Sequence, residues 1–413
     1  MALVPLAEVR TEVLALVPMP LAPVEVALAD ARGLVAAADV TAGEAVPAFA
    51  NSAMDGYAVV AADTAGASAE APVVLAVAGR ILAGHVPDLV VAPGVAVRIM
   101  TGAAVPPGAD AVVPIEVARP PGGDENLVAI ESPAGAGDHV RRPGSDVAPG
   151  DVVLRAGSVL GPARLGVLAQ LGVESVLVHP RPRVGVLSTG DELVEGATPL
   201  LPGQLRDSNR PSLLASVAAA DAEPVDLGLA PDDADAIAAA LRRGAASCDV
   251  VVTSGGVSVG DVDLVKVVLD TLGEVRWVQV AMRPAKPFAY GEVDGVVVLG
   301  LPGNPVSSLV SFELLARPLL RRLAGHPDAA LVRPALRAVA DDALPRHPDG
   351  KVHYARVTAA VGPDGRLHVT TAGGQGSHQL AALAAADGLA VLPDGPGAAA
   401  GDDVDVLLLT ELR

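Results

Sequence analysis

A glycine-rich stretch, Thr253-Ser-Gly-Gly-Val-Ser-Val-Gly-Asp-Val-Asp263, carries the residues best suited to chemistry. It lies between an apolar run at 249–253, typical of a buried strand, and a helical pattern at 264–270. A glycine turn in that position lets backbone N–H groups approach an anion closely. The carboxylates of Asp261 and Asp263 would repel a bare phosphate, so a bridging divalent cation is expected. We expect ligand contacts from Ser254, Gly255, Gly256, Ser258, Gly260 and Asp261.

A second loop, Gly300-Leu-Pro-Gly-Asn-Pro305, follows another apolar run at 295–299. Proline and Gly-Asn are common in rigid turns, so the loop alone does not establish a function. Together with the first loop it predicts a ligand crevice, because ligands bind at the carboxyl ends of strands in open α/β sheets. The expected contacts are Pro302, Gly303, Asn304 and Pro305.

Three other segments have both a functional and an ordinary interpretation. Arg283-Pro-Ala-Lys-Pro287 is either a solvated basic turn or a pre-shaped oxyanion site, in which Lys286 offers a point charge and Arg283 a planar fork. Glu192 follows a strand pattern at 183–187 and is either a local cap or a ligand contact. The loop Asn51-Ser-Ala-Met-Asp-Gly-Tyr57 is consistent with a plain turn at Asp55-Gly56, so this loop alone does not establish a function.

Composition narrows the function further. The formal charge of -19 argues against general nucleic-acid binding, which requires basic surface, and lysine occurs only at Lys266, Lys286 and Lys351. The single cysteine, Cys248, permits no internal disulfide and fits a reducing cytoplasm. Three prolines between 18 and 23 interrupt the apolar N-terminal stretch, so we expect neither signal peptide nor membrane anchor. The histidines and the lone cysteine have no zinc-ligand spacing, and no nucleophile elbow or Walker loop occurs.

The segments that position these residues predict a multidomain α/β and β protein. Residues 1–45 have a helical pattern, 50–145 contain short β-like runs, and 162–172 are helical again. Residues 330–413 are β-rich, with strands expected at 352–357, 367–371 and 404–409. Between them the patterns alternate, which predicts a doubly wound α/β domain with a mainly parallel sheet. Its strands are expected at 183–187, 249–253, 275–280 and 296–299, and its helices at 212–220, 232–243, 261–272 and 306–323.

Six strings occurring in order along nearly the whole chain resemble the molybdopterin molybdenumtransferase family, which includes the gephyrin E domain. They are Asn51-Ser-Ala-Met-Asp-Gly-Tyr-Ala-Val59, Arg98-Ile-Met-Thr-Gly102, Ser188-Thr-Gly-Asp-Glu192, Ser254-Gly-Gly-Val-Ser-Val-Gly-Asp261, Lys286-Pro-Phe288 and Gly300-Leu-Pro-Gly-Asn-Pro305. Any one of these strings is weak, whereas the ordered set is highly specific.

The resemblance implies four parts and a dimer. A discontinuous N-terminal domain (1–50 and 146–180) would carry a β-rich inserted domain (51–145), followed by an adenylyltransferase-like α/β domain (181–326) and a C-terminal β-barrel (327–413). The implied homodimer shares each site between the α/β domain of one subunit and the insert of the other. Molybdopterin adenylyltransferase and molybdoenzymes are the partners that the resemblance suggests.

The implied reaction is insertion of molybdate into adenylylated molybdopterin, with release of AMP. Carried over by motif, Asp55 and Thr101 would face the site from the insert. Glu192, Asp232 and Asp263 would line it from the α/β domain, with Asp232 and Asp263 binding Mg²⁺. The implied molybdate pocket consists of Arg283, Lys286, Ser307, Arg356 and Ser377.

The chain departs from the family pattern at two positions, and two other functions remain as alternatives. The family often has lysine where this chain has Arg283 and glycine where it has Ala285, so the preference between molybdate and tungstate stays open. One alternative is a molybdopterin adenylyltransferase, which catalyses the preceding step. The other is a non-enzymatic scaffold on the same fold; the retained acidic residues argue against it.

Overall fold

The computed structural model describes residues 2–197, 199–256 and 264–410. The chain forms two compact units. Unit 1 comprises Met1–Ala37, Ala156–Leu160 and Val176–Arg413, and unit 2 comprises Ala38–Arg155 and Gly161–Ser175. Unit 2 is therefore inserted into the sequence of unit 1. Each unit has its own hydrophobic core.

Unit 1 is built on a seven-stranded sheet with the order β1-β20-β22-β23-β19-β15-β18. Its strands are β1 (Leu3–Val4), β15 (Arg183–Thr189), β18 (Glu223–Ala230), β19 (Val250–Ser254), β20 (Gly273–Val280), β22 (Pro287–Val293) and β23 (Val296–Leu301). β22 runs antiparallel to both neighbours, and the other pairings are parallel, which confirms the mainly parallel sheet. β22 joins β23 through Asp294 and Gly295, both at positive φ, a combination favoured in two-residue hairpin turns.

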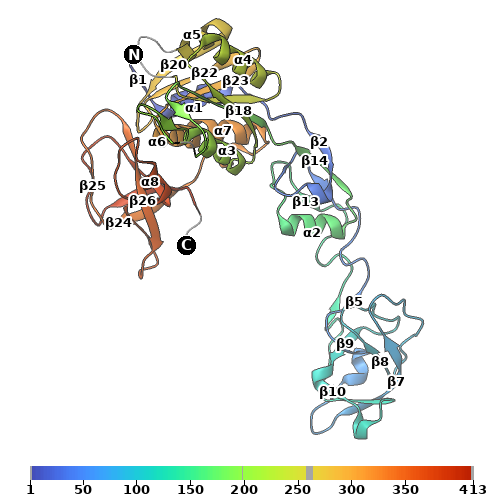
Figure 1. The fold of residues 1–413 in the computed structure, drawn as a ribbon. Helices are drawn as coiled ribbons and strands as arrows, with labels where there is room; N and C mark the ends of the chain where they lie inside the picture. The colour runs from blue at the N-terminus through green and yellow to red at the C-terminus, as the bar shows by residue number, and fades with distance from the viewer. Residues whose placement is uncertain (1, 198, 257–263, 411–413) are drawn as a thin grey trace. The chain divides into compact units, whose positions relative to one another are not determined.

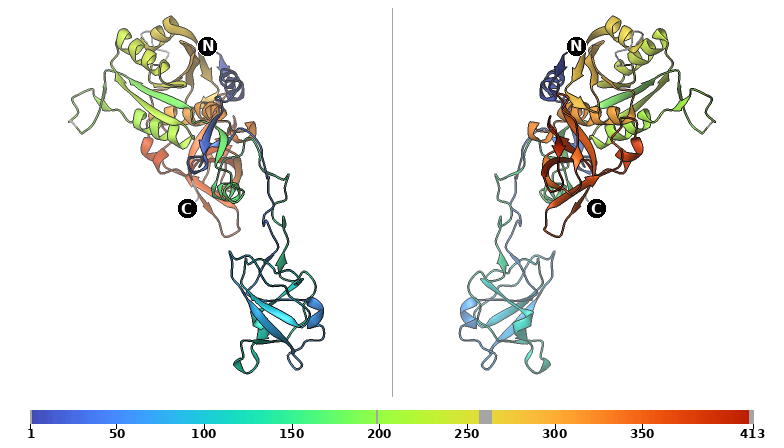
Figure 2. Two further views of the ribbon diagram at one scale, coloured as in Figure 1. Left: turned by 90° about the vertical axis from the view of Figure 1, so that its right-hand side faces the viewer. Right: turned by 90° about the vertical axis from the view of Figure 1, so that its left-hand side faces the viewer.

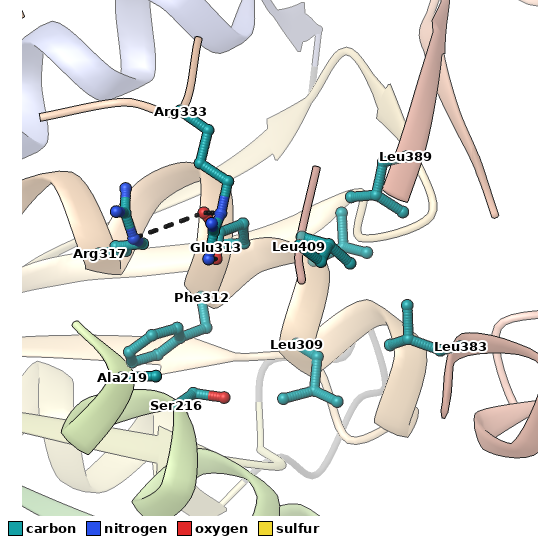
Figure 3. A pocket seen from close by; sticks show the side chains of 11 residues that line it. Ser216, Ala219, Leu309, Phe312, Glu313, Arg317, Arg333, Leu383, Leu389 and Leu409 are labelled. Carbon is teal, nitrogen blue, oxygen red and sulfur yellow. Dashed lines mark hydrogen bonds and ion pairs between the residues drawn. The ribbon is translucent and has the colours of Figure 1, made fainter. Parts of the chain in front are cut away.

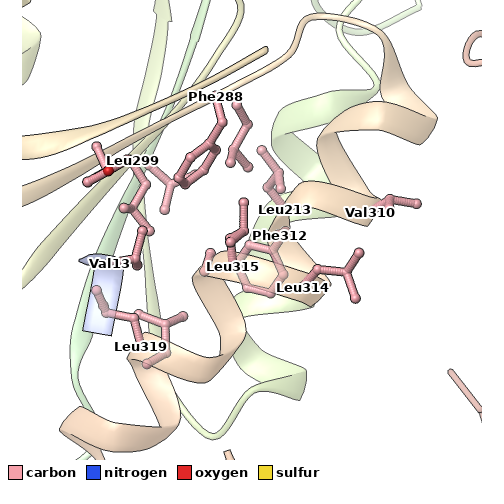
Figure 4. Packing of buried hydrophobic residues seen from close by; sticks show 14 of the residues in the cluster. Val13, Leu213, Phe288, Leu299, Val310, Phe312, Leu314, Leu315 and Leu319 are labelled. Carbon is pink, nitrogen blue, oxygen red and sulfur yellow. The ribbon is translucent and has the colours of Figure 1, made fainter. Parts of the chain in front are cut away.

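Helices cover both faces of this sheet (Figure 1), which explains why β19 is buried along its whole length. One core contains Leu213, Phe288, Phe312 and Leu319 (Figure 4), and the other contains Ile237 and Leu269. The first face carries α1 (Leu6–Ala15), α3 (Asn209–Ala219), α6 (Pro305–Ser311) and α7 (Arg317–Leu323), and the second carries α4 (Ala234–Ala245) and α5 (Leu264–Leu272). A π-helical segment, Phe312–Ala316, joins α6 to α7, so the helix predicted at 306–323 is confirmed with one irregular turn.

The C-terminal part of unit 1 is a closed β-barrel. Five strands pair in the cycle β26-β27-β24-β30-β28, and β28 returns to β26. The strands are β24 (Ala335–Ala340), β26 (Val352–Val361), β27 (Leu367–Thr371), β28 (Gly388–Leu392) and β30 (Asp403–Leu408). A two-residue strand, β21 (Met282–Arg283), pairs in parallel with β26 and sets Arg283 beside His353. The barrel is thereby joined to the loop that follows β20. Smaller elements are β25 (Leu344–Pro345), β29 (Gly397–Ala398) and α8 (Leu380–Ala384).

Unit 2 contains a six-stranded sheet with the order β10-β11-β7-β8-β6-β9. Figure 2 shows this sheet, in blue to cyan, from two opposite sides. Apolar clusters around Tyr57 and Ile130 and around Ile81 and Ile99 pack on it. The strands are β6 (Gly56–Val59), β7 (Val73–Ile81), β8 (Val95–Ile99), β9 (Ala111–Pro114), β10 (Ala118–Arg119) and β11 (Leu127–Ile130). The β-rich insert expected from the sequence is therefore present.

The N-terminal 45 residues differ from the prediction. Only Leu6–Ala15 forms an α-helix, since Pro18, Pro20 and Pro23 prevent its continuation. Short strand pairs follow. They are β2 (Val24–Ala27) and β3 (Val35–Ala36) on either side of β14 (Ser175–His179), β4 (Val40–Thr41) with β13 (Val152–Leu154), and β5 (Asn51–Ser52) with β12 (Val140–Arg141). The helix predicted at 162–172 is α2 (Pro162–Gln170).

Within the described ranges, no helix combines the length and apolar character needed to span a bilayer.

Candidate functional site

The carboxyl ends of β15, β19 and β23 lie side by side in unit 1. Ser188 pairs with Ser254, and Ser254 pairs with Leu301, all in parallel register. The loop after β19 and the loop 300–305 after β23 therefore begin next to each other. Four residues predicted from the glycine-rich turn, Ser258, Gly260, Asp261 and Asp263, lie outside the described residues.

Glycine is required at position 255, where the first loop leaves β19. Gly255 has φ +99°, and a Cβ on it would lie 2.9 Å from the backbone oxygen of Thr189. A Cβ on Gly303 would stand 3.7 Å from Cα of Gly255, so the loop backbones are in contact. Gly256 also adopts a positive φ, +70°. A side chain at Gly255 would therefore be strained and would push this turn away from the end of β15.

Asn209, which was not predicted as a site residue, ties these two loops together. Its Nδ2 donates to Oγ of Ser254 and to the backbone oxygen of Gly303, both at 2.7 Å. Its backbone N–H donates to Oδ1 of Asp207, which also accepts from Oγ of Ser188. Asp207 is further paired with Arg210. The signal available in the sequence is the polar run 207–210 directly before the helix predicted at 212–220, which is ordinary for the start of a helix.

Carboxylates gather at the ends of β15 and β18. Thr189 pairs with Ala230 at the ends of these strands. Asp191 and Asp232 each lie two residues beyond that pair, and Oδ1 of Asp191 accepts a hydrogen bond from the backbone N–H of Asp232 at 2.9 Å. The carboxylate of Glu192 lies directly over Gly190. A Cβ placed on that glycine would stand only 2.5 Å from Oε2 of Glu192. Asp191, Glu192 and Asp232 are all exposed. Among the described residues, no group of three or more His, Cys, Asp or Glu side chains is arranged to hold a metal.

A cavity of about 330 Å³ in unit 1 brings together four of the five residues expected around molybdate. It is lined by Arg283, Lys286, Ser307 and Ser377, and also by Lys351 and Gln375, which were not predicted. Two of the three lysines of this acidic chain therefore line one cavity. No described residue forms a hydrogen bond or ion pair with the side chain of Arg283 or of Lys286.

The fifth residue, Arg356, lies behind the cavity wall. It is fully buried, and its Nη2 donates to the backbone oxygens of Gly374 and Gly376 at 2.6 and 3.2 Å. The side chain of Gln375 forms two hydrogen bonds with the backbone of Arg356. Its Oε1 accepts from the N–H at 2.9 Å, and its Nε2 donates to the carbonyl oxygen at 3.0 Å. Burial lowers the pKa of Arg356. Arg356 thus shapes the loop that carries Ser377, whose backbone oxygen accepts from Val306 N–H at 3.1 Å.

Lys351, unlike Lys286, is engaged in an ion pair. Its Nζ lies 2.7 Å from Oδ2 of Asp349, whose Oδ1 contacts Arg346 and His353. The hydrogen bond from Lys351, aided by His353, lowers the pKa of Asp349 to about 2. Burial lowers the pKa of His353. Lys286 and Arg283 are consequently the cavity cations whose charge is least compensated among the described residues.

Unit 2 positions Asp55 and Thr101 together. Oδ1 of Asp55 accepts from the backbone N–H of Thr101 at 2.7 Å and from its Oγ1 at 2.8 Å. These bonds, backbone first, lower the pKa of Asp55, with a further contribution from the charge of Arg98. The predicted pair therefore forms one exposed, ionised carboxylate–hydroxyl unit.

A different cavity, of about 210 Å³, contains none of the predicted residues (Figure 3). Its wall is mainly apolar, with Leu309, Leu383 and Leu389 among the lining residues. Glu313, on the π-helical segment, pairs with Arg317 at 3.6 Å and with Arg333 at 2.6 Å. Burial lowers the pKa of Arg317 to about 10. This cavity lacks free cationic groups suited to an oxyanion.

Comparison with known proteins covers nearly the whole chain. The MoeA N-terminal region (domain I and II) matches residues 4–172, a probable molybdopterin binding domain matches 185–322, and the MoeA C-terminal region (domain IV) matches 337–409. Molybdopterin molybdenumtransferase 2 of Mycobacterium tuberculosis is 44% identical over 95% of this chain and 94% of its own length. The molybdopterin molybdenumtransferase of Haemophilus influenzae is 36% identical over 97% of each chain.

A solved structure agrees with these matches. The molybdopterin biosynthesis moeA protein from Pyrococcus horikosii is similar with a TM-score of 0.80 and 31% identity, over 99% of this chain and 100% of that one. The resemblance seen in the six ordered strings is thus confirmed. From identity of this extent along the whole chain, we conclude that the protein belongs to the molybdopterin molybdenumtransferase family of enzymes.

Proposed function

We propose that this protein inserts molybdate into adenylylated molybdopterin and releases AMP, forming molybdenum cofactor. The observation that carries the proposal is the cavity of about 330 Å³ in which Arg283 and Lys286 meet two serine hydroxyls. A tetrahedral dianion requires both compensating charge and several hydrogen-bond donors. In a chain with a formal charge of -19, cationic side chains gathered around one cavity favour an anion as its ligand.

In this proposal the cavity residues contribute to molybdate binding in different ways. Lys286 supplies a compact ammonium and Arg283 a planar guanidinium, both facing the same space. Ser307, on the first turn of α6, and Ser377 donate hydroxyl hydrogens. Arg356 acts indirectly, since it fixes the carbonyls of Gly374 and Gly376 in the loop that carries Ser377. The same donors suit tungstate, so competition between the two oxyanions is expected.

The pterin nucleotide is proposed to bind along the two glycine loops at the carboxyl ends of β19 and β23. Ser254, Gly255 and Gly256 offer close backbone approach on one side, and Pro302, Gly303, Asn304 and Pro305 form a rigid wall on the other. From the sequence, Ser258, Gly260 and Asp261 extend the first loop. The ligand's phosphates would lie where the strand ends leave backbone N–H groups.

Mg²⁺ is proposed to bind between the carboxylates of Asp232 and Asp263 and the phosphates of the pterin nucleotide. Hard carboxylate oxygens suit this ion, and Asp232, near Asp191 and Glu192, presents such a donor at the end of β18. Asp263 is the second ligand expected from the sequence. When bound, the ion would screen phosphate charge and favour cleavage of the phosphoanhydride. Asp191 positions Asp232 by accepting its backbone N–H.

The proposed assembly is a cytoplasmic homodimer in which Asp55 and Thr101 of one subunit complete the site of the other. This rests on the family resemblance and on the ionised Asp55–Thr101 pair, which is separated in sequence from the cavity residues. Mixing Asp55→Ala subunits with Lys286→Ala subunits tests it, because half of the heterodimer's sites then carry no substitution. Activity that stays at the level of the separate variants, despite proven subunit exchange, would contradict a shared site.

The proposed reaction is tested by supplying adenylylated molybdopterin and measuring AMP. We expect AMP release that depends on added molybdate and on Mg²⁺. Pyrophosphate release from ATP with molybdopterin would instead identify an adenylyltransferase. Binding without turnover would identify a scaffold.

A further inference from the structure

The polar network around Asn209 is not explained by binding of molybdate, since none of its members lines the molybdate cavity. It connects the ends of three neighbouring parallel strands. Asp207 accepts from Ser188 at the end of β15, while Asn209 reaches Ser254 at the end of β19 and Gly303 after β23. These partners lie 45 and 94 residues from Asn209 in the sequence.

The direction of the Asn209 hydrogen bonds is fixed by their partners. The backbone oxygen of Gly303 only accepts, so Nδ2 rather than Oδ1 must face it. The same nitrogen contacts Oγ of Ser254, which must therefore accept as well. The hydroxyl hydrogen of Ser254 is left for another acceptor. Oδ1 of Asn209 is buried and has no partner among the described residues.

Apart from the hydrogen bonds of Asn209, few contacts between described residues join the two glycine loops. The Gly255 N–H donates to the backbone oxygen of Leu301 at 3.2 Å, which continues the ladder of the sheet. Beyond that point the contact is between Gly303 and Gly255, which have no side chains to interlock. Asn209 is the side chain, within the described part of the structure, that hydrogen-bonds to both loops.

We propose that Asn209 is a positioning residue that holds Ser254 and Gly255, at the start of the first glycine loop, in register with Gly303 of the second, so that these residues present their backbone to the phosphates of the pterin nucleotide. This inference rests on the proposed function, because it assigns the nucleotide to these loops. It predicts that Asn209 affects nucleotide binding and leaves the molybdate cavity unchanged.

Asn209→Asp tests the direction of the bonds. Aspartate has the same shape, but its carboxylate would face the Gly303 carbonyl and repel it, and would take the Ser254 hydroxyl hydrogen. We expect the KM for adenylylated molybdopterin and the Kd for AMP to rise roughly tenfold for Asn209→Ala, the loss expected for one hydrogen bond, and further for Asn209→Asp. The KM for molybdate should stay within about twofold of the parent. Ser212→Ala is the matched control, since it removes a bond to the Ser208 carbonyl on the same helix.

A double-mutant cycle separates positioning from general destabilisation. Because Asn209 acts partly through Ser254 in this proposal, the combined effect of Asn209→Ala and Ser254→Ala should be clearly smaller than the product of their separate effects. Purely multiplicative effects, or equal changes in the KM for both substrates, would overturn the inference. Thermal unfolding shows whether each variant is folded at the assay temperature, and Asn209→Ser replaces any variant that is not.

The measurement of AMP affinity distinguishes failure of this inference from failure of the proposed function. If the parent protein releases no AMP but binds AMP, the proposed function fails, and the cycle is completed with AMP affinities. If the parent releases AMP and Asn209→Asp retains the parental Kd and KM, the positioning role is wrong while the function stands. If the parent neither turns over nor binds AMP, both are wrong.

Discussion

Replacing Lys286 by alanine should weaken molybdate binding more than the same change at Lys351. Both side chains line the cavity of about 330 Å³, so each variant removes one lysine from the same wall. Lys351 is already paired with Asp349 at 2.7 Å, whereas no described residue pairs with the side chain of Lys286. The two variants therefore form a matched pair that differs in the charge available to the anion.

The expected size follows from this difference. A hydrogen bond to a charged group contributes about 1.5–3 kcal/mol, so Lys286→Ala should raise the Kd for molybdate roughly 10- to 150-fold. Lys351→Ala should cost less than about tenfold, because much of its charge is offset by Asp349. Lys286→Arg should recover part of the loss, since a planar fork does not replace a point charge.

Calorimetric titration with molybdate, supported by AMP release against molybdate concentration, measures both variants. The KM for adenylylated molybdopterin serves as the internal control and should change little. Equal losses for Lys286→Ala and Lys351→Ala would refute the argument from charge pairing. A Lys286→Ala protein that binds molybdate like the parent would place the oxyanion elsewhere.

Other perturbations probe the loops around the cavity and the insert. Arg356→Met should raise the molybdate requirement and lower the free energy of unfolding by about 1–3 kcal/mol, because the Gly374 and Gly376 carbonyls lose their donor; unchanged molybdate kinetics would contradict this. Ala285 has φ +75°, so the β-branched Ala285→Val should cost at least about 1–3 kcal/mol in denaturant unfolding, while Ala285→Gly should stay within about 1 kcal/mol of the parent. Asp55 has a lowered folded pKa, so its stabilising contribution is complete above the ordinary aspartate pKa and is lost as pH falls through the folded value. Asp55→Asn should flatten the acid limb of the stability–pH curve, and an unaltered limb would show that Asp55 does not contribute.

The sequence predicted those features that depend on local patterns. Glycine at 255 and 303 and the alternation of apolar runs indicated two loops at strand ends, and the structure places these loops in contact. The resemblance implied a molybdate pocket that includes Arg283, Lys286, Ser307 and Ser377, and the structure places these four residues around one cavity. β22 was missed, although Asp294-Gly295 is a strong hairpin signal, because residues 283–287 were interpreted as a basic turn or an oxyanion site and no strand was expected directly after them.

Features that depend on long-range pairing were not predictable in this way. Lys351 reaches the cavity because β21 pairs with β26, which sets Arg283 beside His353, and no local pattern specifies that register. Asn209 has an ordinary position at a helix start, and its partners become visible only when three strand ends converge. The extent of the N-terminal helix was overestimated because its apolar spacing was given more weight than its three prolines.

The pairing of β1 with β20 has a consequence for biosynthesis. Leu3 and Val4 pair with Gln279 and Val280, so the first strand leaves the ribosome long before its partner exists. At about 5–20 residues per second, roughly 15–55 s separate the two events. Val9 and Val13, fully buried in the finished core, must wait for Leu319 and Leu320 even longer. Unit 2 can fold during that interval, whereas the apolar N-terminal segment stays exposed, which makes it the expected contact for chaperones during translation.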